Sequence, residues 1–283
     1  YISQLTSKVA SSAHIEYHAR IIAQKYLARE LISFTAMIQG KAFDETLDVE
    51  DLMQEAEGKL FEISQRNVKK DVTQINPVIK DAMEMLQKAA LQKEGLSGLR
   101  TGFEGLDKMT SGWQNSDLII IAARPAMGKT AFVLSMAKNM AVNFNTPVAL
   151  FSLEMSNVQL VNRLIVNVCE IPGEKIKSGR LESYEWEQLD FKIKELYDAP
   201  IFVDDTPSLS VFELRTKARR LVREHGIKCI IIDYLQLMNA SGMNFGSREQ
   251  EVSTISRSLK GLAKELNIPI IALSQLNRGV ENR

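Results

Sequence analysis

The stretch LIIIAARPAMGKTAF, residues 118–132, decides the fold of this 283-residue chain. An apolar run typical of a buried strand leads into a short loop of small residues, and a helical pattern follows the loop. The sequence Gly128-Lys129-Thr130 is typical of a phosphate-binding loop, in which backbone N–H groups and the following helix N-terminus face the phosphates. We expect Lys129 to reach the β- and γ-phosphate oxygens and the Thr130 hydroxyl to bind Mg²⁺.

The whole loop, residues 123–130, is expected to bind the nucleotide, so ATP and Mg²⁺ are the predicted cofactors. Besides the three residues just named, the loop contains Ala123, Arg124, Pro125, Ala126 and Met127. Ala123 stands where such loops usually have their first glycine. We therefore expect the backbone at Ala123 to avoid the left-handed region, which alanine disfavours.

Three more polar residues, Asp233, Glu154 and Gln275, each end an apolar, strand-like run. Because the carboxyl ends of parallel strands meet at one edge of a sheet, all three should lie beside the phosphate-binding loop. We expect Asp233 to hold Mg²⁺, Glu154 to polarise the attacking water, and Gln275 to sense the γ-phosphate. The alternatives are a strand-end turn residue for Asp233, a favourable charge at a helix start for Glu154, and a buried, satisfied amide for Gln275.

From residue 95 onward, short β-branched runs alternate with longer helical patterns, which indicates an α/β domain with a mostly parallel sheet. The expected strands are residues 118–122, 148–153, 201–203, 229–232 and 268–273. Ser156, Ser210 and Ser247 each precede a Gln or Glu by three residues, the spacing of a capping box at a helix start. Residues 95–283 are therefore predicted to form one α/β domain.

Before this domain, helical periodicity predicts two helices, one over residues 13–39 that Gly40 ends and one over residues 49–63. The short polar stretch between them favours an antiparallel hairpin, so residues 1–67 are assigned to a helical domain. Residues 68–94 are assigned to a linker. Within it, an amphipathic helix begins at Asn76 and Pro77, and its apolar stripe would need a surface to pack on.

Lys plus Arg and Asp plus Glu both number 35, so no global positive field indicates nucleic acid, and any DNA site must be local. Both cysteines lie in apolar surroundings without a metal-like or disulfide-like spacing, which suits a reducing compartment. No apolar run approaches the roughly 18 residues that span a bilayer. We therefore expect a cytoplasmic protein without membrane contact.

Several stretches together resemble the DnaB family of bacterial replicative helicases, within the RecA-like P-loop ATPases, and the likeness covers nearly all of the chain. They are SGLRTGFEGLDKMTSGWQNSDL, AARPAMGKTAF, FSLEMS, IIIDYLQLM, SRSLKGLAKELN and ALSQLNR. The resemblance makes Ala123 an ordinary loop residue and aligns Glu154, Asp233 and Gln275 with the family's catalytic Glu, Mg²⁺-binding Asp and γ-phosphate-sensing Gln. It also assigns functional weight to Arg163, which from the residues alone is a helical arginine near the site.

The resemblance further implies a homohexameric ring around single-stranded DNA, nucleotide between subunits, 5′–3′ translocation, and primase and a helicase loader as partners. It suggests that the chain starts inside the N-terminal domain and stops before the arginine finger and the main DNA-binding loop. Residues 239–246 are a candidate channel-facing loop, or a surface loop without function. The rival interpretations are a filament-forming RecA-like recombination ATPase and a non-translocating, ATP-locked scaffold for primase and loader.

Overall fold

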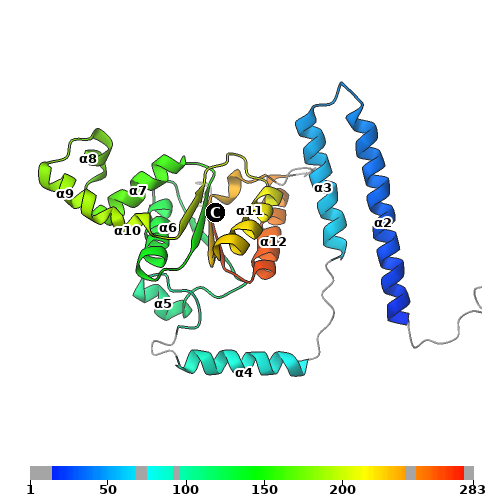
Figure 1. Ribbon diagram of the computed structural model, residues 1–283, viewed down its shortest axis with the longest axis horizontal. Helices are drawn as coiled ribbons and strands as arrows, with labels where there is room; N and C mark the ends of the chain where they lie inside the picture. Colours follow the sequence, from blue (N-terminus) through cyan, green and yellow to red (C-terminus); the bar gives the residue numbers. More distant parts are fainter. Residues whose placement is uncertain (1–14, 68–74, 92–95, 240–246, 277–283) are drawn as a thin grey trace, which may run out of the picture. The chain divides into compact units, whose positions relative to one another are not determined.

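The computed structural model describes residues 15–67, 75–91, 96–239 and 247–276 (Figure 1). These residues fall into two compact units. Helices α2 and α3 form the first unit, and the elements from α4 to β5 form the second.

The first unit is a helical hairpin of α2 (Ile15–Ala42) and α3 (Val49–Asn67), as the sequence predicts (Figure 1). Phe34 and Ile63 are buried, and Lys41 Nζ lies 2.5 Å from a carboxylate oxygen of Glu55. The prediction that Gly40 ends the first helix is wrong, because α2 continues for two more residues. A glycine in a helix costs only about 1 kcal/mol relative to alanine, and the turn that follows is made by Asp44, which accepts hydrogen bonds from the backbone N–H and hydroxyl of Thr46.

The second unit contains a five-stranded sheet in which every pairing is parallel, as expected from the alternating strand and helix patterns. Its order is β1-β5-β4-β2-β3. The strands are β1 (Leu118–Ala123), β2 (Val148–Ser152), β3 (Ile201–Asp204), β4 (Cys229–Asp233) and β5 (Ile270–Gln275). β5, the last of the described strands in sequence, therefore lies between β1 and β4.

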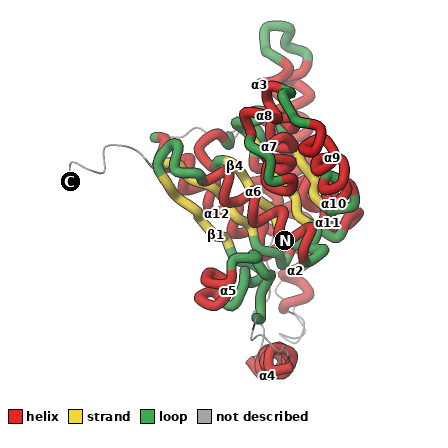
Figure 2. The backbone as a smooth tube through the Cα atoms, turned by 90° about the vertical axis from the view of Figure 1, so that its left-hand side faces the viewer, coloured by secondary structure: helices red, strands yellow, loops and turns green. Residues whose placement is uncertain are grey.

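Helices cover both faces of the sheet (Figure 2). Side chains of a strand alternate between faces, so Ile230 and Ile232 pack into one core cluster while Cys229 and Ile231 pack into the other. The first cluster includes residues of α11 (Val211–His225) and α12 (Arg248–Leu266), and the second includes residues of α6 (Lys129–Lys138) and α7 (Asn157–Cys169). All five residues of β4 are buried, which holds the strand that ends at Asp233 in the centre of the domain.

The predicted helix starts at Ser156, Ser210 and Ser247 are all present. The Ser156 side chain accepts from Gln159 N and the Gln159 side chain accepts from Ser156 N, which completes a capping box. Ser210 and Ser247 each accept from the backbone N–H three residues later. These caps fix where α7, α11 and α12 begin relative to the strand ends before them.

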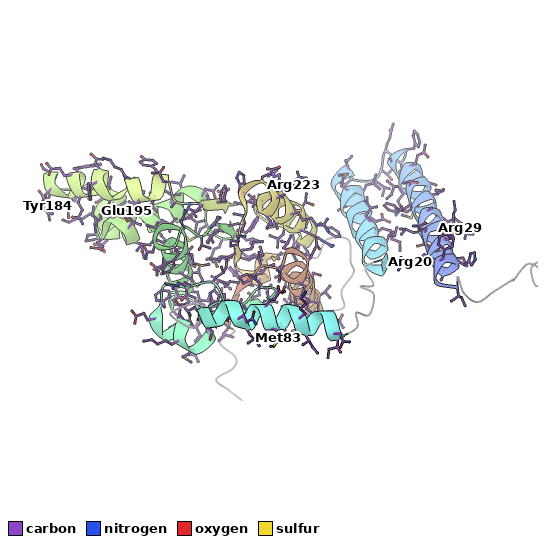
Figure 3. All side chains as sticks on the ribbon, turned by 60° about the horizontal axis from the view of Figure 1, so that its bottom comes forward. Arg20, Arg29, Met83, Tyr184, Glu195 and Arg223 are labelled. Carbon is purple, nitrogen blue, oxygen red and sulfur yellow. The ribbon has the colours of Figure 1, made fainter. Side chains whose placement is uncertain are left out.

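The remaining elements are short or lie before the sheet. They are α4 (Ile75–Leu91), α5 (Glu104–Thr110), η2 (Asn139–Asn143), α8 (Gly173–Ser178), α9 (Ser183–Lys192), α10 (Lys194–Tyr197) and η3 (Leu235–Leu237). On α4, the apolar side chains of Ile75, Ile79, Met83 and Leu86 are each more than half exposed (Met83 is labelled in Figure 3). Among the described helices, none combines the length and apolar composition needed to cross a membrane.

Candidate active site

The phosphate-binding loop joins the end of β1 to the start of α6. Ala123 is the last residue of β1, so its backbone avoids the left-handed region, as expected. The left-handed positions of the loop are instead Ala126, with φ 61°, and Gly128, with φ 83°. Glycine adopts this conformation freely, whereas in alanine it costs roughly 1–2 kcal/mol, and nothing in the sequence pattern singled out Ala126.

Lys129 and Thr130, at the start of α6, reach in different directions. Lys129 Nζ donates to the backbone oxygen of Ala123 at 2.8 Å and to that of Arg124 at 3.5 Å, so its ammonium group lies over its own loop. Thr130 Oγ1 donates to Asp233 Oδ2 at 2.8 Å, a bond that joins the phosphate-binding loop to the tip of β4. Thr130 and Asp233, which are 103 positions apart in sequence, are thus in contact. The rule that parallel strands end at one edge of a sheet predicts this contact.

Asp233 is a buried carboxylate that is 2% exposed. Burial raises its pKa above the ordinary value, and the negative charge of Glu154 acts in the same direction. The Thr130 hydrogen bond and the positive charges of Lys129 and Arg163 oppose this shift without cancelling it. A hydroxyl and a buried carboxylate side by side are hard oxygen donors, the type that Mg²⁺ prefers, and a divalent cation there would stabilise the ionised carboxylate.

Glu154 lies in the loop between β2 and α7, and its side chain is exposed. The loop around it is held by its backbone: Leu153 N donates to Asp233 O at 2.7 Å, and Met155 N donates to Ser152 Oγ at 3.0 Å. At the next turn, Asn157 donates from its backbone and side-chain nitrogens to the carboxylate of Asp205, at 2.8 and 2.9 Å. Glu154 is therefore an exposed carboxylate on a fixed loop beside Asp233.

Arg163 and Gln275 complete the set of predicted residues. Arg163 lies in α7, is exposed, and is near enough to Asp233 to lower the pKa of its carboxyl group. Gln275 is the last residue of β5 and pairs with Ala123, the first residue of the phosphate-binding loop. Its side chain is exposed, so the alternative of a buried amide is wrong.

Sequence reasoning missed Gln236, in η3. Its side-chain amide bonds to Ser274 and to the backbone of Gln275, and its own carbonyl oxygen accepts from the guanidinium group of Arg248. Gln236 lies within the quoted stretch IIIDYLQLM, but no spacing rule indicates a contact with a strand almost forty residues later. Of the candidate loop 239–246, only Asn239 is described, and it forms a parallel bridge with Ser210; residues 240–246 lie outside the described part of the chain.

The parallel sheet, the phosphate-binding loop after β1 and the carboxylate at the tip of β4 together define the RecA-like P-loop class. Within that class, the chain belongs to the family described as the DnaB-like helicase C terminal domain, whose model matches residues 98–283.

The similar proteins carry consistent names. The chain is 48% identical to "Replicative DNA helicase DnaB" of Rhodothermus marinus and 43% identical to the protein of the same name from Geobacillus stearothermophilus, in both cases over 100% of its own length. It covers 30% of the first protein and 62% of the second, so it spans less than two thirds of these curated relatives.

The similar solved structures include an ATPase domain and a DnaB-like replicative helicase. One is the ATPase domain of G40P, with a TM-score of 0.69 and 38% identity, covering 75% of each chain. The other is a DnaB-like replicative helicase described with its interactions with primase, with a TM-score of 0.67 and 35% identity, covering 100% of this chain and 66% of that one. The predicted RecA-like fold is thereby confirmed.

Proposed function

We propose that this protein is a replicative DNA helicase that uses ATP hydrolysis to move 5′–3′ along single-stranded DNA and separate the duplex at a fork. The observation that carries the proposal is the hydrogen bond between Thr130 and the buried Asp233, with Lys129 and Glu154 beside them. This arrangement offers a place for a nucleotide phosphate, a divalent cation and an attacking water at one edge of the sheet. Membership of the helicase family supplies the choice of DNA as the substrate.

The backbone of residues 123–130 would surround the phosphates of ATP, and Lys129 would exchange the carbonyl oxygens of Ala123 and Arg124 for the β- and γ-phosphate oxygens. Thr130 and Asp233 would hold Mg²⁺. Mg²⁺ held there would supply positive charge beside the phosphate oxygens as they become more negative. Glu154, Gln275 and Arg163 would act on the attacking water or on the phosphate.

Glu154 would accept the proton of the attacking water, since it is a carboxylate on a fixed loop and no ion pair with it is found among the described residues. Gln275, at the end of β5, would contact the γ-phosphate and report its loss to the residues that follow. Arg163 would add positive charge on the α7 side, consistent with its effect on the pKa of Asp233.

The wider organisation is also part of the proposal. Residues 1–67 would form the end of an N-terminal domain, residues 68–94 a linker whose helix α4 docks on a second copy, and residues 95–283 the motor. Six copies would form a ring around single-stranded DNA, with primase and a loader as partners; a structural relative is described with primase. The two cysteines are buried and unpaired, which supports a reducing, cytoplasmic setting.

The test is unwinding of a forked DNA duplex by the full-length protein in the presence of ATP and Mg²⁺. Either the 5′ or the 3′ single-stranded tail of the fork is blocked, in separate reactions. Unwinding should require a free 5′ tail and should stop when Mg²⁺ is chelated. Hydrolysis with strand exchange on long filaments would favour the recombination ATPase instead. Rings that bind ATP and recruit primase without unwinding would favour the scaffold.

A further inference from the structure

The side-chain amide of Gln236 forms hydrogen bonds with the end of β5, beyond the last residue of β5 that pairs with β4. The pairing between these strands runs to Ile232 and Ala272. Beyond it, Gln236 Oε1 accepts from Gln275 N at 3.2 Å, while Nε2 donates to Gln275 O at 3.1 Å and to Ser274 Oγ at 2.8 Å. One side chain thus binds both backbone groups of Gln275, as a residue of a neighbouring strand would.

The opposite edge of Gln275 faces the phosphate-binding loop. Gln275 pairs with Ala123, and Leu276 N donates to Ala123 O at 3.2 Å. The same carbonyl oxygen accepts from Lys129 Nζ. The backbone of Gln275 is therefore held between the start of the phosphate-binding loop and the amide of Gln236.

Gln236 also has a contact on a third element. Its carbonyl oxygen accepts a hydrogen bond from the guanidinium group of Arg248, in the first turn of α12. Gln236 itself follows Asp233 by three residues, so its position is set by β4. Gln236 therefore follows β4 in sequence and forms hydrogen bonds with both the end of β5 and the start of α12.

We propose that Gln236 is a positioning residue that keeps Gln275 against the phosphate-binding loop and links that position to the first turn of α12. The inference rests on the proposed function, in which Gln275 contacts the γ-phosphate. Without the amide, the N–H and C=O of Gln275 lose these partners and the end of β5 is free to shift. A displacement of about 1 Å near a reacting group can lower a rate by about 10²-fold.

A double-mutant cycle in the full-length protein with single-stranded DNA tests this proposal. Gln236→Met keeps the side-chain length and removes the amide, so kcat for ATP should fall by about 10- to 100-fold. The affinity for ADP should change by less than about threefold, because Lys129 and Thr130 remain in place. Gln275→Ala should give a similar loss, and the double variant should be no slower than Gln275→Ala, because Gln236 acts through Gln275.

Gln188→Met is the matched control. Gln188 Nε2 donates to the carbonyl oxygen of Cys169 at 2.7 Å and joins α9 to the end of α7. Its replacement also removes a partly buried amide-to-backbone bond, so it should lower the melting temperature while leaving kcat unchanged. An equal loss of kcat in this variant would make the effect of Gln236 a general consequence of lost stability and would overturn the proposal.

The other outcomes are also decisive. Wild-type kcat in Gln236→Met, or losses that multiply in the double variant, would overturn the role of Gln236 while leaving the proposed function intact. Absence of ATP turnover in the wild-type protein would instead contradict the proposed function. If Gln236→Met fails to fold, the cycle is repeated with Gln236→Glu, which keeps the shape and the acceptor and removes the donors; the same criteria then apply.

Discussion

Glu154 combines an exposed side chain with a backbone that is held on both sides, at Leu153 and Met155. Glu154→Gln keeps the size of the side chain and removes the proposed base, so we expect nucleotide binding to persist while hydrolysis slows by roughly 10² to 10⁴. Binding of a fluorescent ATP analogue and single-turnover hydrolysis measure the two effects separately. Equal losses in both would make Glu154 a structural residue.

Asp233 links the chemistry of the site to the stability of the fold. Burial raises the pKa of its carboxyl group above the ordinary value of 3.8, so without a cation the native state holds the proton more tightly than the unfolded chain. The stability from this proton is present below the unfolded pKa and is lost as pH rises through the folded pKa. Wild-type protein at neutral pH therefore contains a buried charge that the fold alone does not favour.

Asp233→Asn should accordingly have a higher melting temperature than wild type at neutral pH without Mg²⁺, and the difference should shrink as pH falls toward about 4. Addition of Mg²⁺ with nucleotide should stabilise the wild type more than the variant, because a carboxylate binds the cation better than an amide. Calorimetry at several pH values checks both statements. A variant less stable than wild type at neutral pH would show that the hydrogen bond from Thr130 outweighs the burial of the charge.

At the scale of elements, α4 exposes an apolar face that the described residues of the chain do not cover. Met83 and Leu86 are 54% and 65% exposed. If this face docks on a second copy, Met83→Asp combined with Leu86→Asp should dissociate rings, because two carboxylates at a packed interface would lose their hydration. Light scattering on the full-length protein measures the change in mass.

Lys80→Asp combined with Gln87→Asp is the control for this prediction. These residues lie on the same helix, are exposed, and are about a quarter turn away from the apolar stripe. The control adds two carboxylates and should leave rings intact. Intact rings with the Met83 and Leu86 substitutions would show that α4 packs elsewhere.

The elements were largely predictable because each has a local cause. β4 is a β-branched run closed by a carboxylate, and α7 begins at a capping box, so both can be recognised within a window of ten residues. The position of Glu154 beside Asp233 followed from the rule that parallel strands end at one edge. The extension of α2 past Gly40 was missed because a glycine costs too little to end a helix by itself.

The contact of Gln236 with β5 was not predictable in the same way. It depends on the strand order, which places β5 beside β4, and on the pairing of these two strands ending at Ile232 and Ala272. The left-handed backbone of Ala126 is likewise imposed by the path of the loop from β1 to α6. Neither feature has a signal in the periodicity or composition of the residues nearby.

For the whole molecule, the proposed ring makes each active site depend on more than one chain. Lys129 and Arg163 of the same chain lower the pKa of the Asp233 carboxyl group against the effect of burial. An arginine from a neighbouring subunit that stabilises the transition state would be worth about 10³ to 10⁵ in rate. Inactive subunits mixed into the ring should therefore poison their neighbours.

The measurement is ATP turnover by rings formed from wild type mixed with increasing fractions of Lys129→Ala. If sites are shared and hydrolysis is sequential, ATP turnover should fall much more steeply than in proportion to the fraction of wild-type subunits. Mixtures with Lys138→Ala, a substitution at the other end of the same helix, should keep full turnover. A linear fall with Lys129→Ala would indicate independent sites.

The place of β5 between β1 and β4 also has a consequence for synthesis. On a ribosome, β1 emerges about 150 residues before β5, and among the described strands β1 pairs only with β5. Until residues 270–275 leave the exit tunnel, β1 and β4 both present unpaired edges, which are the surfaces most prone to pair with other chains. Thr130 and Asp233 stand on opposite sides of that gap. A nascent chain therefore cannot assemble the edge that contains Thr130 and Asp233, or gain stability from the proposed nucleotide, until β5 is inserted.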